Sequence, residues 1–114
     1  AVVNCRSTAP SPPSHGWKRR EVTSASACPA ILFVASTSAA EVAADGVRVN
    51  AVVPGSIEGH MIPQERWTEL AARIPLGRLG TPDEIADAVR YLCSDEARYI
   101  TGHAMDVNGG TWMS

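Results

Sequence analysis

The sequence predicts an α/β fold organised around parallel strands, and three observations support this class. Residues 47–53 (VRVNAVV) are nearly all apolar and mostly β-branched, which is typical of a strand buried on both faces of a parallel sheet. Residues 103–107 (HAMDV) form a second, shorter strand pattern, and two helical patterns separate it from the first. A helix–strand–helix–helix–strand order with two strands of parallel type corresponds to half of an α/β sheet.

The first predicted helix ends at the glycine that precedes the long strand. Residues 39–46 (AAEVAADG) correspond to its last Ala-rich turns, and Gly46 stands where a helix commonly ends in the left-handed conformation. Upstream, residues 30–35 (AILFVA) form the only sizeable apolar run of the N-terminal segment. That run fits either a strand or one buried helical turn.

Two amphipathic helices are predicted between the strands. The first lies between Pro63 and Pro75. One of its faces collects apolar residues at helical spacing: Trp67, Leu70, Ala71 and Ile74. The second begins at TPDE, where Thr81 and Glu84 can form a capping box with Pro at the first helical position. Its apolar stripe consists of Ile85, Ala88, Val89 and Leu92.

Length, charge and cysteine content exclude several kinds of protein. A chain of 114 residues suits one small domain with one hydrophobic core. The formal net charge is -2 and Lys18 is the only lysine, which disfavours nucleic acid and anionic membrane as partners. No apolar run approaches the length of about 18 residues that a transmembrane helix needs. Three cysteines exclude a complete disulfide framework, so we expect reduced thiols and a cytoplasmic protein.

Composition divides the chain near residue 39. Residues 8–38 are rich in Ser, Thr, Pro and Ala and lack sustained periodicity, and their prolines disfavour a helix. We therefore expect residues 1–38 to be divergent and irregular, and residues 39–114 to hold the α/β part. Two compensating shifts of the reading frame, or a divergent fragment, would each account for the first segment.

Five motifs after residue 39 together resemble the C-terminal part of a short-chain dehydrogenase/reductase. They are the RVN strand, the Pro-Gly that follows it, the PLGR-GTP-E-IA helix start, the SD-A–ITG turn and the DVNGG strand. Their order and spacing are family-like from about residue 39 to residue 112. The resemblance implies the C-terminal portion of a Rossmann-like, doubly wound parallel sheet. It also implies NAD or NADP as cofactor and hydride transfer to or from a small carbonyl or alcohol substrate.

In this family the loop after the Pro-Gly contacts the nicotinamide end of the cofactor, outside the carboxyl ends of the strands. The resemblance places cofactor-binding residues at Asn50, Pro54, Gly55, Ile57 and Gly59. It implies that backbone groups of Ile57 pair with the carboxamide. Many relatives carry Thr where this chain has Gly59, so one hydroxyl contact is missing. No metal site is predicted.

The family's acid/base pair is a Tyr with a Lys four residues later, and the Lys lowers a phenol pKa that is otherwise about 10. Neither Tyr91 nor Tyr99 has such a Lys. The usual spacing puts the pair at Ser24 and Cys28, which are no substitute. The opening VVNCRSTA resembles the family strand that ends in the substrate-polarising serine, which would make Ser7 the catalytic serine.

Two further segments correspond to parts of the family fold that contact the substrate or another subunit. Met61, Ile62 and Trp67 lie where the family has a mobile segment over the substrate, and substrate and packing roles both remain open. Trp112 and Met113 lie near the family's subunit contacts, so a homo-oligomer is a candidate assembly.

Two hypotheses from different classes follow. In the first, the chain is the C-terminal part of an NAD(P)-dependent oxidoreductase and is catalytically inactive, because the Tyr–Lys pair is missing and no GxGxxG phosphate loop occurs in it. In the second, the chain is a non-enzymatic interaction module that pairs with a full-length relative through its sheet edge.

Overall fold

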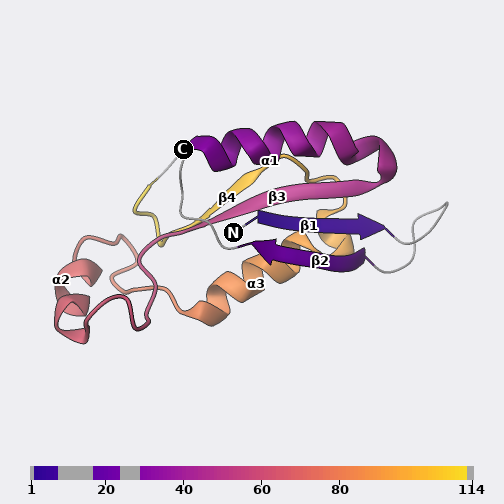
Figure 1. The fold of residues 1–114 in the computed structure, drawn as a ribbon. Coiled ribbons are helices and arrows are strands. Elements are labelled where there is room, and N and C mark those ends of the chain that lie inside the picture. Colours follow the sequence, from indigo (N-terminus) through magenta and orange to yellow (C-terminus); the bar gives the residue numbers. More distant parts are fainter. Residues whose placement is uncertain (1, 8–16, 24–28, 113–114) are drawn as a thin grey trace.

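The computed structural model describes residues 2–7, 17–23 and 29–112 (Figure 1). Its strands are β1 (Val2–Ser7), β2 (Trp17–Thr23), β3 (Val47–Pro54) and β4 (Ala104–Val107). Its α-helices are α1 (Pro29–Val42), α2 (Trp67–Ala71) and α3 (Pro82–Leu92). Short 3-10 helices occupy Ala43–Asp45, Gln64–Arg66 and Asp95–Ala97.

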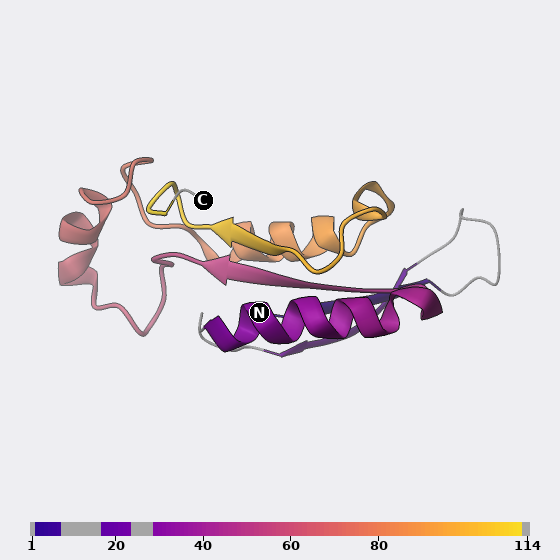
Figure 2. The ribbon, with the colours of Figure 1, turned by 90° about the horizontal axis from the view of Figure 1, so that it is seen from above.

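The strands form one sheet in the order β2-β1-β3-β4. The long strand β3 pairs with β4 in parallel, from Ala51 opposite Ala104 to Pro54 opposite Val107. Helices α1 and α3 lie on opposite faces of this sheet in both views (Figures 1 and 2). The two predicted strands, their parallel pairing and the helices on both faces confirm the predicted α/β class.

The N-terminal strands add an antiparallel part to the sheet. Strand β1 is antiparallel to both β2 and β3. Residues 8–16 are all that joins β1 to β2, and this is shorter than the crossover of about a dozen residues that parallel neighbours need. Because β2 and β3 are both antiparallel to β1, they run in the same direction, with α1 as their connection and β1 between them.

Helix α1 resolves the two alternatives for the apolar run 30–35, because the whole run is helical. The helix begins at Pro29, where a fixed φ and a missing N–H donor are tolerated in the first turn, and it crosses the composition boundary at residue 39. It continues as a 3-10 turn that ends at Gly46, whose φ of 70° is left-handed as predicted.

The helix between Pro63 and Pro75 is present but short. A 3-10 turn precedes α2, and the chain after α2 continues with i→i+3 hydrogen bonds, such as Ile74 N–H to the Ala71 carbonyl at 3.1 Å. Pro75 explains this tightening, since the residue before a proline is disfavoured in the α conformation. The capping box of α3 forms as predicted from Thr81 and Glu84.

The two faces of β3 bury different groups. Val52 packs against Leu92 of α3, and around this pair lie half-buried apolar side chains: Ile85, Ala88, Val89, Cys93, Ile100, Met105 and Val107. Val49 and Ala51 alternate to the opposite face, toward α1, where Ala35 and Ala39 are buried. Strand β3 is thus covered on both faces, by α1 on one and α3 on the other.

Candidate functional site

The carboxyl ends of β3 and β4 lie side by side, and a glycine allows the two backbones to approach. The Gly55 N–H donates to the Val107 carbonyl at 3.0 Å. A Cβ at Gly55 would lie 2.7 Å from the Asn108 Cα, closer than real Cβ contacts. This position therefore requires glycine, because neighbouring backbone occupies the space of a side chain.

Two residues farther along, Ile57 forms an isolated parallel bridge with Gly80. The Gly80 N–H donates to the Ser56 carbonyl at 3.0 Å, and the Glu58 N–H donates to the Gly80 carbonyl at 2.8 Å. In a parallel bridge of this pattern, the N–H and C=O of the central residue point to the opposite side. Ile57 accordingly makes no backbone hydrogen bond to other described residues and presents one donor and one acceptor on its free edge.

The loop then passes Gly59, where a Cβ would meet nothing within 4 Å. Gly59 lies on the wall of an open hollow of about 400 Å³. The other lining residues are His60, Ile62, Pro63, Gln64 and Trp67. The indole N–H of Trp67 donates to the Ile62 carbonyl at 3.0 Å, which ties Trp67 to this loop, whereas Met61 is almost fully exposed. A substrate role and a packing role both stay predictions for these residues.

A smaller cavity of about 100 Å³ lies behind the loop. Its wall is largely apolar and comes from four segments: the loop after β3, residues 74–80, the start of α3, and the end of β4 with the loop that follows it. Arg78 and Glu84 supply its charged edge. The cavity thus separates the loop that carries Ile57 from the start of α3.

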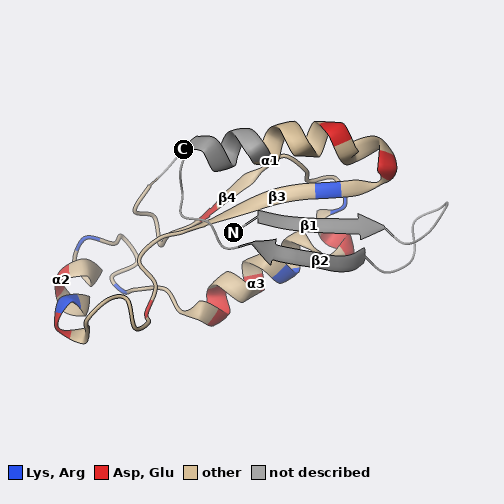
Figure 3. Ribbon diagram, viewed as in Figure 1, with Lys and Arg blue, Asp and Glu red and all other residues tan. Residues whose placement is uncertain are grey.

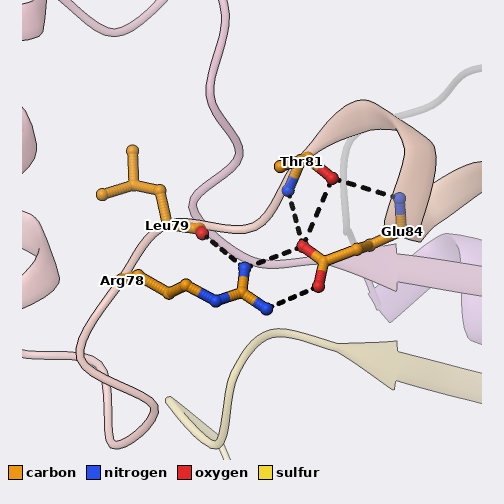
Figure 4. Close-up of polar contacts among 4 residues, drawn as sticks. All are labelled: Arg78, Leu79, Thr81 and Glu84. Carbon is orange, nitrogen blue, oxygen red and sulfur yellow. Dashed lines mark hydrogen bonds and ion pairs between the residues drawn. The ribbon is translucent and has the colours of Figure 1, made fainter.

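Arg78 and Glu84 form a bidentate ion pair at the start of α3 (Figure 4). The two guanidinium nitrogens of Arg78 lie 2.6 and 2.9 Å from the two carboxylate oxygens of Glu84. The Thr81 N–H donates to the same carboxylate at 2.8 Å. These bonds, that from Arg78 first, lower the pKa of Glu84 to about 2, and the carboxylate in turn raises the pKa of Arg78.

Around this site, Figure 3 shows acidic residues in the first turns of α3 and a basic residue toward its end, and residues of both signs around α2. Short-range ion pairs connect them, as between Arg73 and Glu69 at 2.9 Å and between Arg90 and Asp87. Over the described ranges no three His, Cys, Asp or Glu side chains gather where they could hold a metal ion.

The structure brings Pro54, Gly55, Ile57 and Gly59 together at the carboxyl end of β3, but it separates Asn50 from them. Asn50 is 1% exposed, and its amide bridges two backbone groups, the Ile100 carbonyl at 3.0 Å and the His103 N–H at 3.1 Å. These contacts tie the chain before β4 to the middle of β3. They give Asn50 a structural role, and a cofactor contact for it stays a prediction.

Ser7 also lies apart from the loop. Because β1 is antiparallel to β3, Arg6 stands opposite Val47, and Ser7 ends β1 near the start of β3. The carboxyl end of β3, with Ile57 beyond it, lies at the other end of the sheet. The structure therefore does not join Ser7 to the candidate site, and positions 24 and 28 lie outside the described residues.

Sequence reasoning missed two polar contacts that shape this region, the ion pair between Arg78 and Glu84 and the hydrogen bonds of Arg48. Arg78 and Glu84 belong to a motif that we used only as a helix start, and a loop lies between them, so no helical spacing predicts their contact. Arg48, 5% exposed, donates to the Leu92 carbonyl at 2.6 Å and to the Ile100 carbonyl at 2.9 Å. The sequence did contain a signal for these contacts, because Arg48 is a charged residue inside a strand predicted to be buried, and such a side chain needs hydrogen-bonding partners.

Comparison with known proteins identifies the family. A crystal structure of a short-chain dehydrogenase/reductase (glucose/ribitol dehydrogenase) from Brucella melitensis matches with a TM-score of 0.70 and 39% identity, over 75% of this chain and 36% of that one. A family model described as enoyl-(acyl carrier protein) reductase matches residues 14–111. The chain belongs to the short-chain dehydrogenase/reductase family. The resemblance found in the five motifs is thereby confirmed.

Curated relatives of this family match over a similar span. The 3-oxoacyl-(acyl-carrier-protein) reductase FabG of Vibrio cholerae is 48% identical over 86 residues, which are 73% of this chain and 35% of that protein. The (3R)-3-hydroxyacyl-CoA dehydrogenase of Canis lupus familiaris is 38% identical over 86 residues, 73% of this chain and 33% of that protein. The chain thus spans about a third of the length of these relatives.

The helices can also be compared with the dimensions of a bilayer. Across the part of the chain that the structure describes, none combines the length and the apolar character needed to cross a membrane.

Proposed function

We propose that this chain forms the nicotinamide-contacting end of an NAD(P)-dependent oxidoreductase domain. The observation that carries the proposal is the free backbone edge of Ile57, beyond the carboxyl ends of the parallel strands β3 and β4. A carboxamide has one acceptor oxygen and an NH₂ donor, so it complements one backbone N–H and one C=O. Open α/β sheets bind ligands at this edge.

The residues present fit this end of the dinucleotide. Ile57 would hold the carboxamide, and the close packing of Gly55 on the β4 end fixes where the Ile57 edge lies. When bound, the nicotinamide supplies or accepts a hydride at its C4 atom. The open space at Gly59 leaves the family's hydroxyl contact unmade, so we expect weak binding.

We further propose that the chain alone does not turn over substrate. Reduction of a carbonyl needs a proton donor beside the hydride, and a phenol with an unassisted pKa of about 10 is a poor one near neutral pH. Lys18 is the only lysine and follows no tyrosine at the required spacing.

The names of the relatives support a ketone or secondary alcohol as the substrate class of the complete enzyme. We place it in the cytoplasm, where the thiol of Cys93, which forms no disulfide, would remain reduced.

Ligand-observed NMR tests the proposal. Saturation of the protein in the presence of NADH or NADPH should transfer more strongly to the nicotinamide protons than to the adenine protons, because the nicotinamide end has its contacts in this chain. In the same samples, NADPH absorbance with a panel of small ketones should stay constant. Transfer to neither end would contradict the binding proposal, and steady oxidation of the cofactor would contradict inactivity.

A second function, pairing with a full-length relative, is supported by the position of β4. This strand pairs with β3 on one side and with no other described strand. Exposed edge strands can accept a further strand. Light scattering after size-exclusion chromatography, with the chain alone and mixed with a full-length relative, tests this. A chain that elutes as a monomer in both samples argues against pairing.

A further inference from the structure

We propose that the Arg78–Glu84 ion pair is a positioning clamp that holds the Ile57 backbone in place for the dinucleotide. The proposal rests on the proposed function for its ligand, but its structural part can be tested without any ligand. Both residues bond to the chain on either side of Gly80, whereas the free edge of Ile57 points away from Gly80, so both would act through the segment that they enclose.

The bridge between Ile57 and Gly80 needs such support, because it consists of two hydrogen bonds with no ladder on either side. In a longer parallel pair, neighbouring bonds share the restraint along both strands. Here a small shift of Gly80 would move both of its partners, the Ser56 carbonyl and the Glu58 N–H. Ile57 lies between these two groups and would move with them.

The ion pair encloses the segment on both sides of Gly80 (Figure 4). On the N-terminal side, Arg78 donates to the Leu79 carbonyl at 3.0 Å, and on the C-terminal side Glu84 accepts the Thr81 N–H at 2.8 Å. The bidentate contact between Arg78 and Glu84 then closes the ring. Two parallel charge-assisted bonds fix distance and orientation together, which a single bond would not.

Gly80 transmits this restraint to the loop by contact as well as by hydrogen bonds. A Cβ at Gly80 would lie 2.8 Å from Ile57 Cδ1, so the two residues are in close contact. On the other side, Leu79 is 3% exposed and anchors the segment in the interior. Gly80 thus has little freedom to move while the clamp is closed.

The clamp is expected to affect position more than global stability. The side chains of Arg78 and Glu84 are 55% and 41% exposed, and ion pairs at such sites contribute little to the free energy of unfolding. If a residue only stabilised the fold, its substitution would lower the melting temperature, and local exchange rates and cofactor affinity would change only in proportion to that loss. A positioning residue changes these local quantities without a matching change in melting temperature.

Two variants open the clamp in different ways. Arg78→Met removes the charge and the donors but keeps much of the apolar stem. Glu84→Gln keeps an amide oxygen that can still accept the Thr81 N–H, so the capping box survives while the ion pair is lost. Arg90→Met is the matched control, because Arg90 forms an exposed ion pair with Asp87 on the same helix, α3.

Amide hydrogen exchange is the first measurement. Opening the clamp should speed exchange of the Glu58 and Gly80 N–H groups about tenfold, as expected for loss of a charge-assisted restraint. The Ala51 N–H, which donates to the His103 carbonyl at 2.8 Å in the middle of the sheet, should be unchanged. Unchanged exchange at Glu58 and Gly80 in both clamp variants would overturn the proposal, as would an equal effect of Arg90→Met.

Affinity for NADH is the second measurement, followed by cofactor fluorescence. Both clamp variants should raise the dissociation constant about five- to tenfold, and Arg90→Met should not change it. Arg78→Lys, which keeps the charge but loses the bidentate fork, should fall between wild type and Arg78→Met. If the clamp variants bind NADH as wild type does, the positioning role is overturned. If the wild-type chain itself binds no dinucleotide, the proposed function fails, and the exchange measurement alone decides the clamp.

Discussion

Gly55 lies against the backbone of Asn108, so closely that a Cβ on Gly55 would come within 2.7 Å of the Asn108 Cα. This contact joins the carboxyl ends of the parallel strands β3 and β4, and the candidate site lies in the loop that follows β3. The turn that follows gives Asn108 little room to move, since its side chain accepts from the Gly110 N–H at 2.9 Å and donates to the Trp112 carbonyl at 3.1 Å.

We therefore expect Gly55→Ala to destabilise the chain by about 1–3 kcal/mol, because the added methyl meets fixed backbone and one of the strand ends must shift. Urea unfolding followed by circular dichroism measures this. Gly59→Ala is the matched control, since a Cβ there meets nothing within 4 Å, and it should change stability by no more than about 0.5 kcal/mol. Equal effects of the two substitutions would show that the Gly55 contact is unimportant.

The free edge of Ile57 leads to a second prediction. Ile57→Pro removes the N–H that would donate to the carboxamide, while the bridge bonds, which belong to Ser56, Glu58 and Gly80, remain available. Affinity for NADH should fall about tenfold, in proportion to one buried hydrogen bond. Ile57→Val keeps the N–H and should bind within about twofold of wild type. Equal loss in both variants would assign the effect to packing of the side chain instead.

Restoring the family's hydroxyl group should improve binding. The space around Gly59 is open and its φ is not in the left-handed region, so Gly59→Thr introduces no clash. One new hydrogen bond to the carboxamide or phosphate should lower the dissociation constant for NADH about three- to tenfold. Gly59→Val has the same shape without the hydroxyl and should give no gain; a gain in both variants would point to apolar contact.

Buried Arg48 is expected to matter for stability. Its guanidinium satisfies the Leu92 carbonyl at the C-terminus of α3 and the Ile100 carbonyl before β4. Arg48→Met leaves these acceptors without that donor and should cost about 2–4 kcal/mol in the free energy of unfolding. Arg90→Met, on the exposed face of α3, should cost no more than about 0.5 kcal/mol in the same urea titration. Similar losses in the two variants would contradict the structural role of Arg48.

The ion pair of Glu84 predicts a pH dependence. Its pKa is lowered from 4.5 to about 2 in the folded chain, first by the bond from Arg78 and then by the Thr81 N–H. A carboxylate with a depressed pKa stabilises the folded state fully above the unfolded pKa, and this contribution is lost as pH falls toward the folded value. The difference in melting temperature between wild type and Glu84→Gln, which is small because the ion pair is exposed, should therefore be constant above about pH 4.5 and shrink between pH 4.5 and 2. A difference that does not change over this interval would contradict the low pKa.

Several elements could be predicted from short stretches of sequence. The end of α1 at Gly46, the capping box at Thr81 and Glu84, and the buried strand β3 all depend on signals that lie within a few residues of one another. Backbone geometry imposes these signals locally: a left-handed φ favours glycine, a helix N-terminus needs an acceptor, and a strand covered on both faces needs apolar residues. The same local motifs also indicated the family.

The helical start of α1 and the direction of β1 were not accessible in this way. The run 30–35 has no periodicity that separates a strand from a helical turn, and only the structure shows it as part of a helix, α1, which packs against β3. The antiparallel direction of β1 follows from how it pairs with β2 and β3, and it moves Ser7 away from the end of β3.

The sequence by itself thus determined the fold class and the family, and it predicted the loop that we propose to contact a nicotinamide. Only the tertiary structure decided which of the loop's groups are free. Asn50 is engaged by Ile100 and His103, about fifty residues away, whereas the Ile57 backbone is left open by a bridge that uses its neighbours. The physical reason is that a hydrogen-bonding group is available to a ligand only if no distant part of the chain has satisfied it, and local sequence carries no record of those distant partners.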